Sequence, residues 1–282
     1  MDAALHAKRR RSELSARVSR SSILSFFDPL ELILVPSFND MPVRAVLLDI
    51  EGTTTPVVFV YEVLFPYARE RVSTFLTQNW DDSGVRADIA GLRAEYAADE
   101  RKDLEPPIWW SGTPEAEQKC AAAYVRWLTD RDRKSAPLKS LQGKIWEWGY
   151  RCGELRGEIY SDVGAAFARW RSQKKDICIF SSGSVLAQKL LFAHSTAGDL
   201  TPFLRAYFDT TTGPKQEPAS YTRIAAAMNL AATSVLFISD VVGELEAAKR
   251  AGMLTALCLR PGAKEPVAME FSVVRTFEEV FP

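Results

Sequence analysis

Two carboxylates, Asp49 and Glu51, follow an apolar stretch (AVLL at 45–48) and precede a glycine and three threonines. Short apolar runs of this kind are typical of buried parallel strands, and side chains two residues apart in an extended backbone point to the same side. One carboxylate could then attack a substrate or bind a metal ion while the other transfers a proton. The pattern also fits a strand that ends in a solvated loop, so the interpretation depends on matching residues at later strand ends.

Three later segments carry side chains suited to binding phosphate or a metal ion. Ser181 and Ser182 open a serine-glycine-serine turn before a helical stretch, where hydroxyl and backbone N–H groups can hold an anion. Lys215 lies in a glycine-proline turn, from which its charge could neutralise a phosphoryl group. Asp240 follows another apolar run and offers the oxygen ligands that Mg²⁺ prefers. Taken singly, these are also the residues of a helix N-cap, a solvated lysine and a loop acid.

A further acid, Glu244, lies four residues after Asp240. If a helix begins there, Glu244 points back towards the site and can orient metal-bound water. It can equally be a first-turn acid that interacts only with the helix dipole. The sequence leaves both interpretations open.

The elements that must position these residues alternate between strands and helices. The patterns predict helices at 162–173, 185–193, 217–229 and 243–251, and strands at 43–48, 176–180, 207–209, 234–239, 253–259 and 272–274. This order is typical of an α/β fold with a doubly wound parallel sheet. In such a sheet, ligands bind beyond the carboxyl ends of the strands, where the residues above are expected to meet.

The segment between the first and second strands reads as helical throughout, with apolar spacing at 60–80, 81–99, 114–129 and 138–150. It is too long for an ordinary crossover connection, so we expect an inserted all-helical domain. The predicted boundaries are 41–62 and 158–282 for the catalytic core, and 63–157 for the helical cap. Trp109 and Trp110 fall in a loop of this insertion and either join its core or line a substrate pocket.

The composition narrows the classes of function. The formal net charge of −1 gives no electrostatic reason to expect nucleic acid or membrane as a partner. Four cysteines without a CxxC pair suit reduced thiols rather than a disulfide framework. With only two histidines, a histidine-rich metal site and most serine or cysteine triads are excluded, and His194 is expected to cap a helix or make a surface contact. We expect a monomer located in the cytoplasm, with the nucleus as a further location.

Residues 1–40 differ from the rest of the chain because they are rich in arginine and serine and poor in acids. This composition fits an organellar targeting segment. It also fits a disordered extension that precedes a start at Met41, and we favour this second interpretation.

The order Asp-x-Glu, Ser, Lys, Asp along one sheet is more specific than any single motif. It resembles the haloacid dehalogenase superfamily of phosphotransferases, in which a cap is inserted after the first motif. Longer strings resemble the enolase-phosphatase family, the acireductone synthases of methionine salvage. They are DIEGTTTP at 49–56, VLFPY at 63–67, DRK at 132–134, LQG at 141–143, SSGSV at 181–185, AQKLLF at 187–192, HST at 194–196 and FDT at 208–210.

The resemblance implies a bifunctional reaction on 2,3-diketo-5-methylthiopentyl 1-phosphate, a small-molecule phosphate ester, with one Mg²⁺ per subunit. The substrate is enolised and then dephosphorylated to the acireductone 1,2-dihydroxy-3-keto-5-methylthiopentene, through an aspartyl-phosphate on Asp49. By the family's motifs, Asp49 is the nucleophile and a metal ligand, and Glu51 is the acid-base residue and contacts the metal through its backbone carbonyl. The other site positions are matched by Asp240 for the metal and by Ser181, Ser182 and Lys215 for the substrate phosphate.

Some features depart from the family or stay open. Pro214 and Pro218 stiffen the turn around Lys215, which puts the reach of the lysine in doubt. The base for enolisation is either Glu51 or a residue of the cap. The alternative functions are a general Mg²⁺-dependent phosphatase of the same superfamily, and a non-catalytic scaffold that binds a partner through the cap.

Overall fold

The computed structural model describes residues 38–110, 112–133, 135–263 and 271–282. They belong to a unit that spans Pro36–Pro282. The predicted extension, residues 1–40, lies almost entirely outside the described residues, and only its last residues are seen, as the short helix η1 (Phe38–Asp40). No described helix is both long and apolar enough to cross a membrane.

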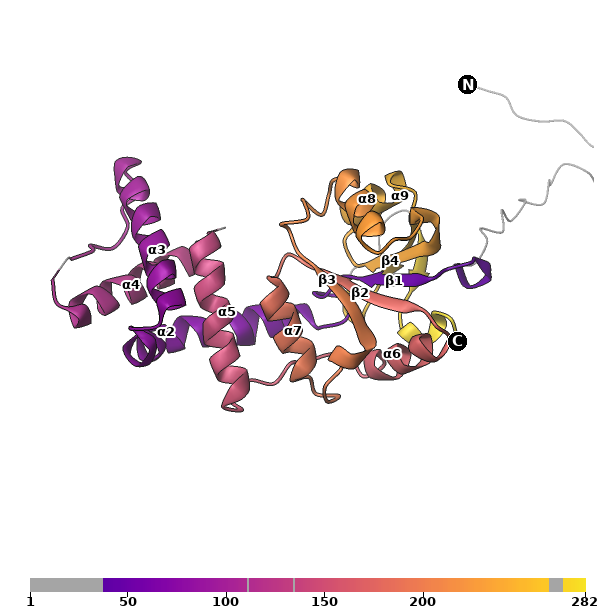
Figure 1. Cartoon of the computed structure of the whole chain (residues 1–282), viewed down its shortest axis with the longest axis horizontal. Coiled ribbons are helices and arrows are strands. Elements are labelled where there is room, and N and C mark those ends of the chain that lie inside the picture. Colours follow the sequence, from indigo (N-terminus) through magenta and orange to yellow (C-terminus); the bar gives the residue numbers. More distant parts are fainter. Residues whose placement is uncertain (1–37, 111, 134, 264–270) are drawn as a thin grey trace, which may run out of the picture. The chain divides into compact units, whose positions relative to one another are not determined.

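A parallel sheet lies at one end of this unit, and helices α2–α5 (residues 65–151) extend to its other end (Figure 1). The described strands lie in the order β3-β2-β1-β4-β5-β6, and each is parallel to its neighbours. Their bounds are β1 (Ala45–Leu48), β2 (Asp176–Phe180), β3 (Leu204–Phe208), β4 (Val235–Ser239), β5 (Leu254–Cys258) and β6 (Ser272–Val274). The prediction of a doubly wound α/β sheet is therefore confirmed.

Helices cover both faces of the sheet: α6 (Val163–Ser172), α7 (Val185–Ala193), α8 (Pro218–Ala227) and α9 (Val242–Arg250), with short turns η3 (Thr201–Phe203), η4 (Ala232–Ser234) and η5 (Phe277–Glu279). Successive strand residues point to opposite faces. Leu48 of β1 packs with Phe167 of α6 on one face. Leu47 packs with Tyr221 of α8 and Leu245 of α9 on the other. Because both faces are covered, the central strands β1 and β4 are buried along their whole length.

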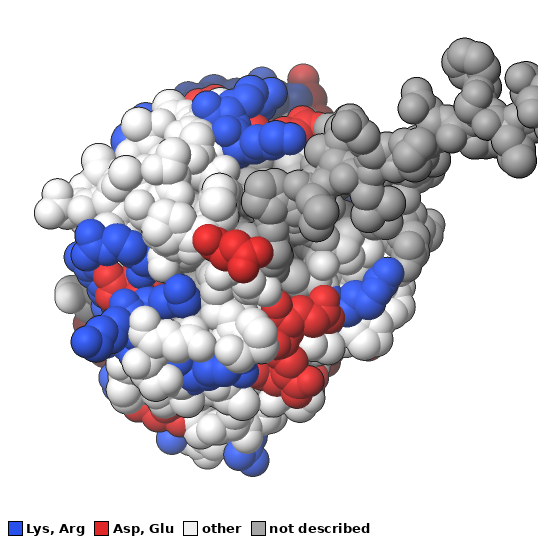
Figure 2. All heavy atoms as spheres, turned by 90° about the vertical axis from the view of Figure 1, so that its right-hand side faces the viewer, with Lys and Arg blue, Asp and Glu red and all other residues white. Residues whose placement is uncertain are grey.

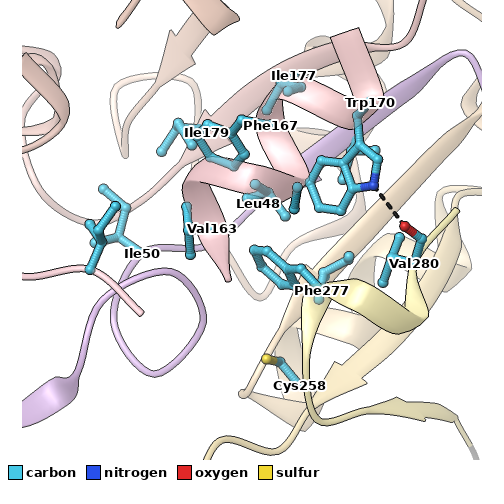
Figure 3. Packing of buried hydrophobic residues seen from close by; sticks show 14 of the residues in the cluster. Leu48, Ile50, Val163, Phe167, Trp170, Ile177, Ile179, Cys258, Phe277 and Val280 are labelled. Atoms are coloured by element: carbon cyan, nitrogen blue, oxygen red, sulfur yellow. Dashed lines mark hydrogen bonds between the residues drawn. The ribbon is translucent and has the colours of Figure 1, made fainter. Parts of the chain in front are cut away.

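The C-terminal residues seal the first of these faces (Figure 3). Phe277 packs against Trp170, with ring centroids 5.2 Å apart. The Trp170 indole Nε1 donates a hydrogen bond of 2.7 Å to the carbonyl oxygen of Val280, drawn as the dashed line in Figure 3. The chain end is thus part of the core that supports the sheet.

The helical segment between β1 and α6 consists of α1 (Val57–Phe59), a π-helical turn η2 (Val60–Leu64), α2 (Phe65–Asn79), α3 (Ser83–Arg101), α4 (Pro114–Thr129) and α5 (Ala136–Arg151). Side chains of Asp82, Thr113 and Ser135 cap the N-termini of α3, α4 and α5. These helices share an apolar cluster of their own, which includes Leu76 and Tyr124. The boundaries 63–157 for a cap domain stay a prediction.

Most differences from the predicted elements occur at their ends. The first residues of the predicted helix at 60–80 form the π-helical turn η2, and α2 begins only at Phe65. Strand β3 begins at Leu204, three residues before the predicted start. The prediction missed these residues because Arg205 interrupts the apolar pattern at the start of the strand. His194 caps the C-terminus of α7 and stacks on Tyr150 with ring centroids 5.4 Å apart, as expected for a structural histidine.

The two tryptophans of the cap loop have different surroundings. Trp109 packs against Tyr96 and Tyr124, with ring centroids 5.4 Å and 5.8 Å apart, so it belongs to the cap's apolar cluster. Trp110 is 66% exposed. The cap core, rather than a substrate pocket, therefore accounts for Trp109.

Charged side chains on the surface are mixed in sign. The face shown in Figure 2 carries lysine and arginine next to aspartate and glutamate, with uncharged areas between them. This mixture agrees with the formal net charge of −1.

A buried acid in the cap, Asp99, should be important for stability. It accepts hydrogen bonds from the Tyr124 hydroxyl (2.7 Å) and from Arg133 (3.0 Å), and is 2% exposed. Burial alone would raise the pKa of Asp99, but these partners hold it below the ordinary 3.8. The stabilisation is therefore fully present above pH 3.8 and is lost as the pH falls through the lower folded-state pKa.

We expect Asp99→Asn to lower the free energy of unfolding by about 1–3 kcal/mol at neutral pH, because Tyr124 and Arg133 lose a charged acceptor. Asp130→Asn is the matched control, since it breaks an exposed pair with Arg69 and should cost less than about 1 kcal/mol. Denaturant unfolding of both variants measures the difference. Equal losses would contradict a special role for Asp99.

Candidate active site

The loop after β1 holds Asp49 in a fixed, buried position at the carboxyl edge of the sheet. Asp49 is 2% exposed, and its backbone N–H donates to the Ile238 carbonyl of the neighbouring strand β4 (3.1 Å). The Ile50 carbonyl accepts hydrogen bonds from the next turn, at Thr53, Thr54 and Thr55. The threonines of the sequence motif thus close a tight loop that fixes the direction of the Asp49 and Glu51 side chains.

The carboxylate of Asp240 lies against this loop. Strands β1 and β4 are paired, with Leu48 opposite Ile238, so Asp49 and Asp240 follow neighbouring strand ends. Gly52 has a φ of +72°, and a Cβ atom built on it would lie 2.2 Å from Asp240 Oδ2. Only a glycine leaves room for the acid at this point.

Asp240 carries the features expected of a cation ligand. Its Oδ1 is buried and has no hydrogen-bond partner among the described residues. Burial and the charge of Asp49 raise the pKa of Asp240 to about 6. A buried acid pair without a shared donor is stabilised by a hard cation, so the residues present fit Mg²⁺. No cluster of three or more histidine, cysteine, aspartate or glutamate side chains suited to a metal occurs in the described ranges, so further ligands would be backbone, substrate or water oxygens.

Lys215 meets the predicted nucleophile. Its Nζ is 2.5 Å from Asp49 Oδ1 and 2.7 Å from Glu244 Oε2, and its side chain is 9% exposed. Burial opposes the charged form, but the two carboxylates raise the pKa of Lys215 above its ordinary value. The lysine therefore stays protonated at neutral pH.

The prolines of the turn do not direct Lys215 away from the site. The Ser220 hydroxyl donates to the Pro214 carbonyl and the Tyr221 hydroxyl donates to the Lys215 carbonyl, both at 2.7 Å. Pro218 is the first residue of α8, where a missing N–H costs no hydrogen bond. The stiff turn and the helix together aim the lysine at Asp49.

Glu244 faces the site from the first turn of α9. Its Oε2 contacts Lys215 and accepts a hydrogen bond of 3.0 Å from the Ser239 hydroxyl, which is also 3.4 Å from Asp49 Oδ2. Burial and the charge of Asp49 raise the pKa of Glu244 to about 7, against the opposing effect of Lys215. Glu244 is thus more than an acid that interacts with the helix dipole.

Ser181 and Glu51 contact each other on the opposite side of Asp49, towards β2. The fully buried Ser181 hydroxyl lies 3.3 Å from Glu51 Oε2 and accepts the Gly183 N–H at 3.0 Å. Burial and the charge of Asp49 raise the pKa of Glu51, which favours its protonated form. Ser182 is exposed in the loop that leads to α7. The catalytic and binding roles of these residues stay predictions.

Two supporting residues lie in strings that resemble the family, but the sequence analysis gives neither of them a role. Gln188 Nε2 donates to the carbonyls of Gly183 (2.9 Å) and Phe208 (2.8 Å), which joins the serine loop to the end of β3. Asp209 accepts the N–H of Val185 at 3.4 Å and is itself fixed by Thr211. Asp209 could have been found, because it follows a strand just as Asp49 and Asp240 do. Gln188 stands in an apolar helix, and the string AQKLLF that contains it does not indicate which groups its amide binds.

Comparison with known proteins identifies the family of the chain. The family model named haloacid dehalogenase-like hydrolase matches residues 43–252 of this chain. Enolase-phosphatase E1 of Synechococcus elongatus is 51% identical over 238 residues, which cover 84% of this chain and 98% of the relative. Enolase-phosphatase E1 of Pseudomonas aeruginosa is 45% identical over 223 residues, which cover 79% and 92%. The chain belongs to the enolase-phosphatase family.

A solved structure supports the fold of this enolase-phosphatase family member. The UTR4 protein of Saccharomyces cerevisiae superimposes with a TM-score of 0.67 at 33% identity, over 84% of this chain and 99% of the yeast chain. The predictions of the family and of an enzyme of the hydrolase class are confirmed.

Proposed function

We propose that the enzyme is an acireductone synthase of methionine salvage, which converts 2,3-diketo-5-methylthiopentyl 1-phosphate into the acireductone 1,2-dihydroxy-3-keto-5-methylthiopentene and phosphate. The observation that carries the proposal is the buried contact of Lys215 with Asp49, beside the Ser181–Glu51 pair and Asp240. The match to the enolase-phosphatase E1 of Synechococcus elongatus extends over 98% of the length of that relative. We further propose a monomer of the cytoplasm, with the nucleus as a further location.

Phosphoryl transfer needs a positioned nucleophile and neutralised charge. Asp49 attacks phosphorus, the bond from phosphorus to the ester oxygen breaks, and Glu51 gives its proton to that oxygen. Glu51 then takes a proton from water, which attacks the aspartyl-phosphate and releases phosphate. Lys215, the Ser181 hydroxyl and the N–H groups at the start of α7 hold the phosphoryl oxygens.

Asp49 and Asp240, with the Glu51 backbone carbonyl, would hold Mg²⁺. When bound, the ion supplies positive charge that screens the repulsion between Asp49 and the phosphate and polarises the diketone. Enolisation also needs a base beside the carbonyl group, and Glu51 and a residue of the cap are the two candidates.

Exposed apolar side chains near these charged loops support a substrate with an apolar end. Large apolar side chains are 38–61% exposed directly after the loops of β1, β2 and β4. They are Val57, Val58, Tyr61, Leu186, Val241 and Val242. Each of these side chains follows a strand whose carboxyl end carries a residue of the candidate site, and apolar side chains beside polar groups are typical of small-molecule sites. A thioether chain attached to a phosphate matches this combination better than a sugar or nucleotide phosphate does.

The test is to supply the diketone phosphate with Mg²⁺ and to follow the enol absorbance and free phosphate together. We expect both signals, the enol first. Release of phosphate from simple esters without turnover of the diketone would instead favour a general phosphatase. No release from any ester would favour the non-catalytic scaffold.

Leu186 should contribute to the preference for an apolar substrate. It is the second residue of α7, is 39% exposed and lies beside Gly143 of α5. We expect Leu186→Ser to lower kcat/KM for the diketone phosphate by about 1–2 kcal/mol, or roughly 5- to 30-fold. Turnover of glycerol phosphate serves as the control and should not change. An equal loss for both substrates would argue against an apolar contact.

A further inference from the structure

Arg260, two residues after β5, is buried next to the loop that carries Asp49. It is 6% exposed, and its Nε donates a hydrogen bond of 2.9 Å to the Thr53 carbonyl. A second guanidinium nitrogen is 2.6 Å from Asp162 Oδ2. The guanidinium carbon lies 4.4 Å from the ring centroids of both Tyr160 and Phe277, so the planar group is held between two aromatic rings.

This arrangement is costly if stability is its only purpose. A buried guanidinium needs partners for all its N–H groups, yet one terminal nitrogen of Arg260 and Oδ1 of Asp162 have no hydrogen-bond partner among the described residues. Asp162 is also bound by the Phe277 N–H at 2.6 Å, so the acid is fixed by the chain end shown in Figure 3. An apolar side chain would fill the same space at lower cost, but it could not bind the Thr53 carbonyl.

The Thr53 carbonyl belongs to the loop whose shape sets the site. Within this loop, the Ile50 carbonyl accepts three N–H groups and the Thr55 carbonyl accepts the Gly52 N–H. The Thr54 carbonyl accepts the Tyr160 N–H at 3.0 Å. Arg260 therefore completes the attachment of the loop to the core from the β5 side. A shift of Thr53 would move Gly52, which lies against Asp240, and Glu51 next to it.

We propose that Arg260 is a positioning residue for phosphoryl transfer. It holds the loop 50–55 through the Thr53 carbonyl. In this way it keeps the side chains of Glu51 and Asp49 at fixed distances from those of Asp240 and Lys215. It does not touch the substrate. This role of Arg260 rests on the proposed function only where kcat for the diketone phosphate is measured, and hydrogen exchange of the loop 50–55 tests it independently.

The chain offers a matched control in Arg169 of α6. This arginine donates to the carbonyls of Phe277, Val280 and Phe281, so it anchors the same chain end as Arg260. None of its hydrogen bonds reaches the loop 50–55. A comparison of the two arginines separates anchoring of the chain end from positioning of the loop.

The experiment compares Arg260→Met, Arg260→Lys and Arg169→Met in the full-length chain with Mg²⁺. Kinetics on the diketone phosphate and hydrogen-exchange mass spectrometry of the peptide that contains 50–55 are measured at 25 °C, and a thermal scan gives the melting temperature. We expect Arg260→Met to lower kcat by about 10- to 100-fold, with KM changed less than about 3-fold, because reacting groups are misplaced rather than removed. Exchange in 50–55 should be faster. Arg260→Lys should recover part of kcat.

Arg169→Met should lower the melting temperature but leave kcat within about 2-fold and exchange in 50–55 unchanged. If Arg260→Met behaves in the same way as Arg169→Met, Arg260 is only structural and the proposal is wrong. If Arg260→Met does not fold, Arg260→Lys decides by the same readouts. If the wild-type chain does not turn over the diketone phosphate, the proposed function fails, whereas the exchange of 50–55 still tests Arg260.

Discussion

Replacing Asp49 by asparagine should abolish phosphate release even at saturating Mg²⁺. The amide cannot attack phosphorus, and it no longer offers the charge that Lys215 contacts at 2.5 Å. Loss of a nucleophile typically lowers kcat by roughly four to six orders of magnitude. Malachite-green detection of phosphate from the diketone substrate measures the effect, and circular dichroism checks that the variant is folded.

Asp176→Asn is the matched control for this substitution. Asp176 begins β2 at the amino edge of the sheet, opposite Ala45, and pairs with Arg171 and Arg205. It is far along the strand from the candidate site, so its loss should leave kcat unchanged. Turnover retained by Asp49→Asn would remove Asp49 as the nucleophile.

Lys215→Ala should have the second largest effect, a loss of kcat/KM of about 2–4 kcal/mol, or roughly 30- to 1,000-fold. The charge is preorganised in a buried position, where it stabilises the phosphoryl group more than it would in water. Its removal also leaves Asp49 and Glu244 facing each other without a cation from the protein. Steady-state kinetics, together with inhibition by inorganic phosphate, measures both transfer and phosphate binding.

Lys175→Ala serves as the comparison for Lys215→Ala. Lys175 is also partly buried, but it donates to the Val43 carbonyl and lies over the Phe281 ring, beside the chain end rather than the site. We expect a modest loss of stability and unchanged kcat. Kinetics of Lys215→Ala equal to those of the wild type would mean that the lysine takes no part in transfer.

The sequence predicts the framework of the site because strand ends carry strong local signals. Asp49 and Asp240 each follow an apolar run, and a parallel sheet brings such ends to one edge. Which strands are neighbours is decided by the packing of the whole sheet, so the pairing of β1 with β4 could only be seen in the structure. The sequence could not predict where the Lys215 side chain points, because Pro214 and Pro218 stiffen the turn without indicating the direction of the lysine.

The supporting contacts are harder to predict because they join residues far apart in the sequence. Gln188 and Arg260 bind backbone carbonyls, which have no sequence signature. The π-helical turn η2, between α1 and α2, has no marker in the helical apolar spacing. The roles of Ser182 and of the extension 1–40 remain predictions.

Gly52 has a consequence for any attempt to redesign the specificity of this enzyme. Its backbone conformation disfavours ordinary side chains, and the space where one would begin is filled by Asp240. A library that randomises residues 50–55 alone should return glycine at position 52 in every active clone. Varying Asp240 as well would not free the position, because the positive φ of Gly52 would remain and Asp240 is itself a proposed Mg²⁺ ligand, so the two loops must be kept together.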